Sequence, residues 1–586
     1  MRTTLICVVI FLVALVVRGF HWQDNPIPPF HGMTGEYKAH ALDLVNGDLK
    51  GFVRGPSPPS DANVIKHPPG YPLLMAVVYK VFGESDSALR LLHIVGDGCA
   101  ALLVFFIAYE LFSFAIATLS GFLVALSPQL AYHSVALLPD PLAAPPLLLA
   151  VYLLIGAYKH PRLLTIFAAG FMIGVSCWFR SNTLLLPLFV CALFPLLFQR
   201  GVRVRFAATL LSGFLLLVVP VTIRNAIFFC SLVPLSLSAG ITLVEGIGVY
   251  DREKRFGLPD NDYLVSKWEA ETFQRPDYLS NRFGVDGVMR ERYRIKRGLA
   301  VITAQPFWFS RVMAHRGLSM LRLTRVELVR AQPAVTHSLD IKEGAAPSWT
   351  VMPSSDEANI SRHSAAKLSV GTADRNVRME DAGRGFVTFA SPAVSSNTDY
   401  LLLVPVKVEH GSVGVEVLDA QQNTLALSPA RHPVNWMDLE EKDQPERILE
   451  VPFVSGNTTS VNIRLRTESG PLALELGPMK AFALGPASQT WTRYPRQLLS
   501  LVQKSFITAV MLPFTLVGVI ALARRRRWVE LALLGVVPIY YMCVQSALWT
   551  EFRYILSMHY FLFIFAAVGF GALVSALRRR FLRRSA

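Results

Sequence analysis

Residues 31–90 form a polar stretch between two hydrophobic segments, and several of its side chains could do acid–base and anion-binding chemistry. Glu36 lies early in this stretch, and Lys66 and His67 open the later sequence Lys-His-Pro-Pro-Gly-Tyr-Pro. A carboxylate within hydrogen-bond reach can take the proton of a hydroxyl nucleophile. Cationic side chains can stabilise the charge on a departing phosphate. Held against a bilayer, this stretch suits chemistry on a lipid-linked phosphate.

The composition places most of the chain in a membrane. Of its 586 residues, 52% are hydrophobic and 17% are charged, whereas soluble domains carry roughly 25% charged residues. The mean hydropathy is +0.40. Several apolar runs are long enough to cross a hydrocarbon layer about 30 Å thick. We predict ten membrane helices, near 4–20, 88–111, 114–131, 137–157, 163–179, 183–199, 206–224, 502–523, 528–547 and 554–577.

The net charge of +15 indicates membrane topology rather than nucleic-acid binding. Many of the excess cations flank apolar segments, where they set orientation under the positive-inside rule. This rule and an even number of crossings predict a multi-pass protein with both termini in the cytoplasm. The compact layout with short loops indicates a bacterial inner membrane. The long polar segments 21–87 and 225–500 then face outward. The cationic flanks lie at 159–162, 199–205, 524–527 and 578–584.

The six cysteines lie in or beside hydrophobic segments and show no CxxC spacing. They behave as small apolar residues and predict neither a disulfide framework nor a metal site. We expect the protein to need no metal and no cofactor.

A change of pattern after residue 370 predicts a second domain. Valines alternate with other residues along 404–408 and 413–417, and the alternation continues at 461–465. Period-two alternation in short runs between turn signals is typical of half-buried strands. The predicted organisation is a membrane module at 1–330 with outward loops at 21–87 and 225–330, a linker at 331–370, an extracytoplasmic β-sandwich at 371–490 and C-terminal membrane helices in 491–586.

Short motifs follow one another in a definite order relative to the hydrophobic segments. They are Glu36-Tyr37, His67-Pro-Pro-Gly-Tyr-Pro72, Phe82-Gly83, Leu89-Arg90, Leu138-Pro-Asp140-Pro-Leu142, Arg180-Ser-Asn182, Arg224-Asn225, Glu245-Gly-Ile-Gly248 and Glu551-Phe-Arg553-Tyr554. In this combination the chain resembles the polytopic GT-C glycosyltransferases that use polyprenyl-phosphate sugars. These enzymes are related to protein O-mannosyltransferases and lipid A aminoarabinose transferases. The resemblance covers residues 1–330 and 500–577 and implies a helical GT-C-like membrane fold.

The resemblance also implies that an acidic residue in the first outward loop activates the acceptor. Glu36 is the carboxylate expected to do so here. Many relatives carry the acidic residue three or four positions before the tyrosine, where this chain has Met33 and Thr34. Asp140 matches the second acidic position of the family and is the other expected catalytic residue.

The remaining implied roles concern the donor and the sugar. The resemblance places a basic residue just before the Pro-Pro pair to bind the donor phosphate, and arginines at helix ends on the same side could complete an anionic pocket. The expected donor-phosphate ligands are Lys66, His67, Arg90, Arg224 and Arg553, and the expected substrate contacts are Tyr37, Tyr71 and Glu245.

Each of these residues also has a structural interpretation. Glu36 could be a solvated loop residue or the partner of an arginine, and Asp140 before proline is well suited to cap a helix. An arginine at a membrane edge often reaches for lipid headgroups. Glu245 could shape a turn.

We expect an inverting glycosyltransferase that moves a sugar from a polyprenyl-phosphate donor to a lipid, glycan or protein acceptor on the periplasmic face. One rival is a transporter or flippase of lipid-linked saccharides, which needs ionisable residues inside its helices. Asp97 and Arg180 are the few such candidates. Another rival is a non-catalytic scaffold of the cell envelope, which Met33 favours.

Overall fold

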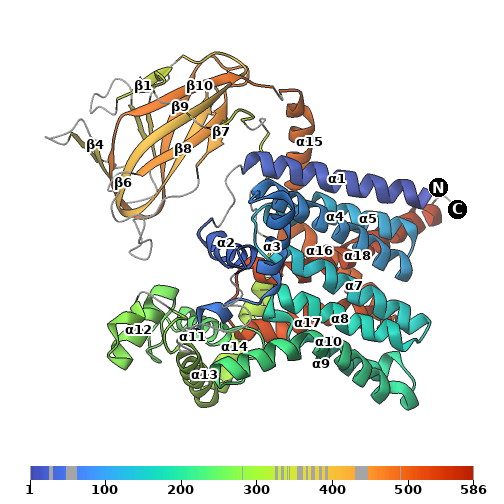
Figure 1. The fold of residues 1–586 in the computed structure, drawn as a ribbon. Helices are drawn as coiled ribbons and strands as arrows, with labels where there is room; N and C mark the ends of the chain where they lie inside the picture. Colours follow the sequence, from blue (N-terminus) through green and yellow to red (C-terminus); the bar gives the residue numbers. More distant parts are fainter. Residues whose placement is uncertain are drawn as a thin grey trace. The chain divides into compact units, whose positions relative to one another are not determined.

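The computed structural model divides the chain into two compact units (Figure 1). We call Met1–Leu328 with Val502–Ala586 the membrane unit and Val329–Leu501 the sheet unit. The structure describes residues 2–25, 31–47, 62–279, 282–323, 328–331, 335–339, 341, 344–352, 360–363, 367–370, 377–381, 386–389, 393–428, 447–488 and 490–584.

The membrane unit is helical, and six of its described helical segments are long and apolar enough to cross a membrane. Up to eight spans result if each of two bent helix pairs counts as one span. Each predicted membrane segment overlaps one or two helices. The segments 114–131 and 502–523 reach the length of a span only as parts of the bent pairs, and the helices at 163–179 and 183–199 fall short of it, so the predicted number of ten is not confirmed. The six spans are α1 (Arg2–Asp24), α4 (Asp86–Leu111), α7 (Asp140–Lys159), α10 (Arg200–Phe229), α17 (Trp528–Val544, extended to Ala547) and α18 (Leu556–Arg584, of which Phe552–Arg579 forms the candidate span).

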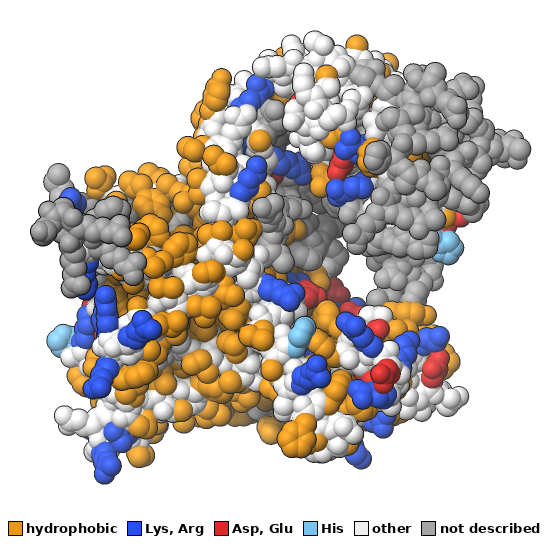
Figure 2. Space-filling view, turned by 180° about the vertical axis from the view of Figure 1, so that it is seen from behind, with side chains coloured by type: hydrophobic (Ala, Val, Ile, Leu, Met, Phe, Trp, Pro, Cys, Tyr) orange, Lys and Arg blue, Asp and Glu red, His pale blue; other side chains and the backbone are white. Residues whose placement is uncertain are grey.

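The two bent pairs and the shorter apolar helices complete the set. The pairs are α5 (Phe114–Leu126) with α6 (Pro128–Ser134), bent by 53°, and residues 490–503, which include α15 (Arg493–Gln503), with α16 (Thr508–Arg524). Residues 490–501 of the second pair belong to the sheet unit. The shorter helices are α3 (Gly70–Phe82), α8 (Leu163–Phe179), α9 (Leu186–Leu197) and α11 (Ala239–Tyr250). Figure 2 shows a broad hydrophobic surface with lysines and arginines towards its edges, as expected for a surface that faces lipid.

Close helix packing in the membrane unit depends on glycine. Gly213 in α10 lies against the backbone carbonyl of Phe167 in α8, and Gly170 in α8 lies in the same way against Leu210 in α10. Small residues let helix backbones approach in a membrane, where packing and interhelical hydrogen bonds replace the hydrophobic effect as the cause of association.

Replacing Gly213 with alanine is therefore expected to destabilise the membrane unit by about 1–3 kcal/mol, because the added methyl group collides with backbone atoms that cannot rotate away. Thermal unfolding of the purified protein in detergent measures this change. Gly156→Ala in α7 is the matched control, since a methyl group added there meets no atom of a neighbouring described element within 4 Å. An equal loss of stability in both variants would contradict the packing argument.

A layer of polar helices continues the membrane unit at the end where α2, α11 and α12 lie (Figure 1). These helices are α2 (His31–Val45), α12 (Asp262–Phe273), α13 (Gly287–Ala304) and α14 (Pro306–Met320). Glu269 of α12 is buried and binds both Arg290 and Arg294 of α13, at 2.6 to 2.8 Å. Glu291 of α13 accepts the Gly240 N–H at the start of α11. This buried network fixes α11 relative to α12 and α13.

The sheet unit contains, in its described part, ten antiparallel strands in one hydrogen-bonded sheet. Its longest strand, β6, pairs with β10 and β8 along its first half and with β9 along its second half, across irregularities between Val408 and Val413. The strands are β1 (Trp349–Val351), β2 (Ile360–His363), β3 (Lys367–Val370), β4 (Val377–Asp381), β5 (Phe386–Phe389), β6 (Thr398–Asp419), β7 (Thr424–Leu427), β8 (Arg447–Val454), β9 (Val461–Leu476) and β10 (Met479–Pro486).

The predicted alternation in the sheet unit is present. Val413, Val415 and Val417 are fully buried, as are Val461, Ile463 and Leu465 on the paired strand β9, and all belong to one core. A sheet domain is therefore confirmed, while its division into the two facing sheets of a sandwich stays a prediction.

The sheet begins earlier in the chain than the predicted boundary at residue 371. Strands β1, β2 and β3 lie within 331–370, the range of the predicted linker, and they pair with β10, β5 and β4. Their sequences are short and lack a clear alternation, which hides them among the Ala, Ser and Pro residues. Several other residues of this predicted linker, such as 353–359, lie outside the described part of the chain.

Candidate active site

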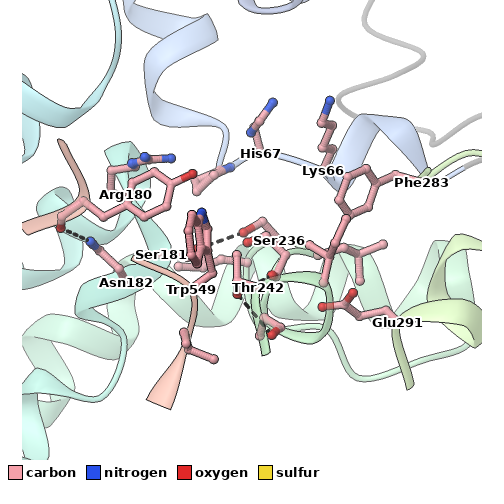
Figure 3. A pocket seen from close by; sticks show the side chains of 18 of the residues that line it. Lys66, His67, Arg180, Ser181, Asn182, Ser236, Thr242, Phe283, Glu291 and Trp549 are labelled. Atoms are coloured by element: carbon pink, nitrogen blue, oxygen red, sulfur yellow. Dashed lines mark hydrogen bonds between the residues drawn. The ribbon is translucent and has the colours of Figure 1, made fainter. Parts of the chain in front are cut away.

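A cavity of about 680 Å³ lies in the membrane unit at the end formed by α2, α11 and α13. Figure 3 shows Lys66, His67 and Arg180 along one side, with Ser236, Thr242 and Glu291 along the other. A cavity of this size is typical of a small-molecule site. Its charged lining residues are Glu36, Lys66, Asp140, Arg180, Glu245, Asp260, Asp262, Arg282, Glu291, Arg292, Glu551 and Arg553.

Glu36, the predicted base, and Lys66, a predicted ligand of the donor phosphate, are bound to each other. Lys66 Nζ contacts both carboxylate oxygens of Glu36, at 2.8 and 2.6 Å. His67 Nε2 lies 3.3 Å from Glu36 Oε2, and the Tyr37 hydroxyl lies 3.3 Å from His67 Nδ1. A neutral imidazole with its proton on Nε2 satisfies both contacts, because it donates to Glu36 and accepts from Tyr37.

The charges in this cluster follow from its surroundings. Burial opposes ionisation of Glu36, but the His67 hydrogen bond and the Lys66 charge outweigh it and lower the pKa of this carboxyl to about 2. Burial lowers the pKa of His67 to about 4 despite Glu36, so that at neutral pH His67 is uncharged. Burial also lowers the pKa of Lys66, against the effect of Glu36. Glu36 is therefore a carboxylate already paired with a cation, and His67 can offer a hydrogen bond but no charge.

Tyr37 and Tyr71 support this cluster by packing behind it. The Tyr37 ring packs edge-on against Tyr71, with 5.1 Å between ring centroids. The Tyr71 hydroxyl lies 3.1 Å from His93 Nε2, and Tyr71 is fully buried. Tyr37 lines the cavity, whereas Tyr71 does not. The predicted substrate contact at Tyr71 is thus a packing contact behind Tyr37.

Asp140 reaches the cavity as predicted and is paired with an arginine outside the predicted set of site residues. Arg180 binds Asp140 Oδ1 at 2.6 to 2.7 Å, and its guanidinium lies 4.5 Å from the Tyr554 ring centroid. Asp140 Oδ2 is buried and has no hydrogen-bond partner among the described residues. The motif Arg180-Ser-Asn182 is the available signal for Arg180, but its spacing alone does not indicate Asp140 as its partner.

Arg553 also lines the cavity, next to Met33. Its Nε lies 2.6 Å from Glu551 Oε2, and its Nη1 lies 2.9 Å from the Met33 sulfur. Glu551 is therefore the counter-ion of Arg553, whereas the Met33 thioether beside the guanidinium carries no charge.

Arg282 is a further cavity cation, and no motif points to it. It pairs with Asp262 and also interacts electrostatically with Glu36 and with Glu245. Arg282 is distant in sequence from the first outward loop, and only the fold brings it close to Glu36 of that loop.

Glu245 faces the same cavity from α11 and is 6% exposed. None of the described residues donates a hydrogen bond to its carboxylate. Burial raises the pKa of Glu245 to about 7, since Arg282 and Arg294 only partly offset it.

Two predicted phosphate ligands do not line this cavity. Arg90 is buried in α4, where it donates to the Asn25 carbonyl at 2.9 Å. Arg224 lines a second cavity of about 220 Å³ on the other side of the loop at His67 and Pro68, which border both cavities. Sequence order places both arginines at helix ends but cannot tell which way the side chains point.

Among the described residues, no group of three or more His, Cys, Asp or Glu side chains is arranged to hold a metal ion. We therefore assign no metal ligand.

Residues 66–224 match the family described as dolichyl-phosphate-mannose-protein mannosyltransferase. This match confirms the family resemblance along the segment that holds Lys66, His67, Asp140 and Arg180. No curated protein matches the chain.

The solved structures that are similar to the chain include the following three. Archaeal oligosaccharyltransferase AglB from Archaeoglobus fulgidus, in complex with an inhibitory peptide and a dolichol-phosphate, has 12% identity over 99% of this chain and 52% of its own, with a TM-score of 0.41. ArnT from Cupriavidus metallidurans, bound to undecaprenyl phosphate, has 15% identity over 54% of this chain and 64% of its own (TM-score 0.31). Arabinosyltransferase EmbB from Mycobacterium smegmatis has 10% identity over 82% and 65% (TM-score 0.26). The chain spans about half the length of the oligosaccharyltransferase.

Proposed function

Starting from the family match of residues 66–224, we propose that the chain is an integral-membrane glycosyltransferase that moves a sugar from a polyprenyl-phosphate donor to an acceptor. The cavity carries the proposal. Lys66, Arg180 and Arg553 come from three separate segments and converge on a space of about 680 Å³. Such cations stabilise the negative charge of a departing lipid phosphate.

The donor phosphate would compete with Glu36 for Lys66. In the resting site Lys66 is held by both oxygens of Glu36. The intact donor is a phosphodiester with one negative charge, like a carboxylate. The departing lipid phosphate gains a second charge and a third unesterified oxygen, so it can draw Lys66 into the cavity as the bond to the sugar breaks. Arg180 keeps Asp140 as its partner and offers its remaining N–H groups.

The second cavity suits the lipid end of the donor. Its lining is largely apolar, with Pro68, Pro72, Trp178 and Val221 next to Arg224. Because His67 and Pro68 border both cavities, a prenyl chain in the smaller one would place its phosphate near Lys66.

The proposed orientation rests on the two ends of the membrane unit. Lys159 binds Glu110 at 2.5 Å and Arg527 donates to the Leu111 carbonyl at 2.7 Å, so three basic or polar loops meet at one end. The cavity lies at the opposite end of α4 and α7. Under the positive-inside rule the basic end is cytoplasmic, which supports a cavity on the periplasmic face of a bacterial inner membrane and both termini inside. Ten spans result if α8 and α9 also cross.

The reaction would be a single displacement. The acceptor hydroxyl of a lipid, glycan or protein attacks the anomeric carbon from the side opposite the phosphate, which inverts the configuration at that carbon. Neither a nucleotide nor a cofactor enters this step.

The test uses membrane vesicles that contain the protein together with a panel of radiolabelled polyprenyl-phosphate monosaccharides, beginning with the mannose donor. We expect label to pass from the donor lipid to a second product, with release of polyprenyl phosphate, and we expect no transfer from nucleotide sugars. The double variant Lys66→Met/Arg553→Met should be inactive. Movement of intact donor across the vesicle without transfer would favour a flippase, and neither activity would favour a scaffold.

A further inference from the structure

Glu245 is a buried carboxylate without a hydrogen-bond donor among the described residues, in a cavity whose other central carboxylates are paired. Glu36 is held by Lys66, Asp140 by Arg180 and Glu551 by Arg553. Glu245 itself is 6% exposed. Glu245 lines the cavity, so a ligand there can complete the contacts of its carboxylate.

The helix that carries Glu245 is fixed before this residue, where Glu291 accepts the Gly240 N–H, and after it. Arg316 of α14 donates to the Gly246 carbonyl at 2.6 Å and to the carbonyls of Ser546 and Leu548, each at 2.7 Å. Gly248 packs so closely against the Pro259 carbonyl that a side chain would not fit. The Glu245 carboxylate is therefore presented to the cavity from a rigid backbone, as a group that acts on a reacting atom must be.

The charges that face Glu245 come from four neighbouring elements. Asp260, before α12, and Glu551, in the late loop, raise its pKa, while Arg282 and Arg294 lower it. Arg316 of α14 uses its N–H groups on backbone carbonyls. Burial remains the largest effect and brings the pKa of Glu245 to about 7.

Glu36 differs in each of these respects. Its side chain is 43% exposed, both its oxygens are bound, and its pKa is lowered to about 2 by His67 and Lys66 against the effect of burial. A general base works best when its pKa lies near the working pH, because a strongly acidic carboxyl accepts a proton poorly.

We propose that Glu245, rather than Glu36, takes the proton of the acceptor hydroxyl during sugar transfer, and that Glu36 is the resting counter-ion of Lys66. This assignment rests on the proposed function. The acceptor oxygen forms a bond to the anomeric carbon as the bond from that carbon to the phosphate oxygen breaks. The hydroxyl proton passes to the Glu245 carboxylate, and the lipid phosphate leaves with the bonding electron pair.

The experiment compares wild type, Glu245→Gln and Glu245→Asp in vesicles, with the labelled donor that the wild type uses and a fixed amount of membrane as the source of acceptor. Initial rates are measured from pH 5 to pH 9. Wild-type activity should rise with pH through a limb near pH 7. The rate of Glu245→Gln should fall by roughly 10²- to 10⁴-fold, and its remaining rate should no longer rise with pH near pH 7. Glu245→Asp should keep this rise. Glu271→Gln, an exposed carboxyl of α12, is the control.

Two further measurements separate a catalytic role from loss of the fold. Binding of ³²P-labelled undecaprenyl phosphate to the purified variant should stay within about twofold of wild type, because the phosphate side of the cavity is unchanged. Thermal unfolding should show Glu245→Gln to be more stable than wild type at pH 8 and similar at pH 5. A carboxyl whose pKa is raised by folding loses stability as the pH rises from its unfolded value to about 7.

The outcomes are distinct. Loss of rate and limb with intact phosphate binding supports the assignment. A Glu245→Gln variant that keeps the wild-type rate and pH profile overturns it, as does a variant that loses phosphate binding together with activity. A wild type that transfers no sugar from any donor overturns the proposed function, and the assignment falls with it.

Discussion

Replacing Lys66 with methionine is expected to weaken binding of a lipid phosphate by about 10- to 100-fold. A hydrogen bond to a charged group contributes about 1.5–3 kcal/mol, and about 1.4 kcal/mol corresponds to a factor of ten. Methionine keeps the length of the side chain and removes its charge. Equilibrium binding of ³²P-labelled undecaprenyl phosphate to the purified protein measures the loss directly.

The matched control for this prediction is Lys80→Met, which changes an exposed lysine of α3 outside the cavity. It should bind the phosphate as wild type does.

The pH dependence of stability provides a second check. Because the pKa of Glu36 is lowered to about 2, Glu36 stabilises the fold above its unfolded value, and this stability is lost as the pH falls through about 2. In Lys66→Met the loss on acidification should be smaller. Unchanged phosphate binding would remove Lys66 from the donor site.

The second large effect concerns the buried pair of Arg18 and Asp97. Both side chains are fully buried, and Arg18 Nε donates to Asp97 Oδ2 at 2.6 Å, while Tyr560 donates to the other carboxylate oxygen. Replacing Asp97 with leucine leaves the Arg18 charge buried without its counter-ion. We expect a loss of about 3–5 kcal/mol, measured as thermal unfolding in detergent.

The double variant Arg18→Met/Asp97→Leu distinguishes charge from packing. It should recover part of the lost stability, because no uncompensated charge remains. Recovery should be incomplete, since Arg18 also donates to the carbonyls of Val124 and Ala125, just before Pro128 interrupts the helix between α5 and α6. A double variant as unstable as Asp97→Leu would contradict the ion-pair explanation.

This pair also bears on the transporter hypothesis. Asp97 and Arg180 are the ionisable residues that favour it from the sequence. In the structure Asp97 is fully occupied by Arg18 and Tyr560, and Arg180 lies at the cavity with Asp140. Neither forms a relay through the described helices, so these residues are better explained by stability and by the site.

The amino-acid sequence by itself determined the helical membrane fold and the approximate position of the candidate site. Apolar runs of the required length reveal membrane helices, because a helix satisfies its backbone hydrogen bonds within one continuous segment of the chain. The alternating valines likewise predicted the strands of the sheet unit. The order of motifs placed Glu36, Lys66, His67 and Asp140 around one site, and the structure has all four in one cavity.

Only the tertiary structure decided how these groups are paired. The pairing of Lys66 with Glu36 and of Arg180 with Asp140 depends on how helices pack, and the direction of Arg90 and Arg224 depends on helix rotation, which a motif does not encode. The isolation of Glu245 among the described residues follows from the packing of α11 against its neighbours. The electrostatic field and the burial at each side chain of a site depend on residues that are distant in sequence. Only the folded structure sets the distances between those residues.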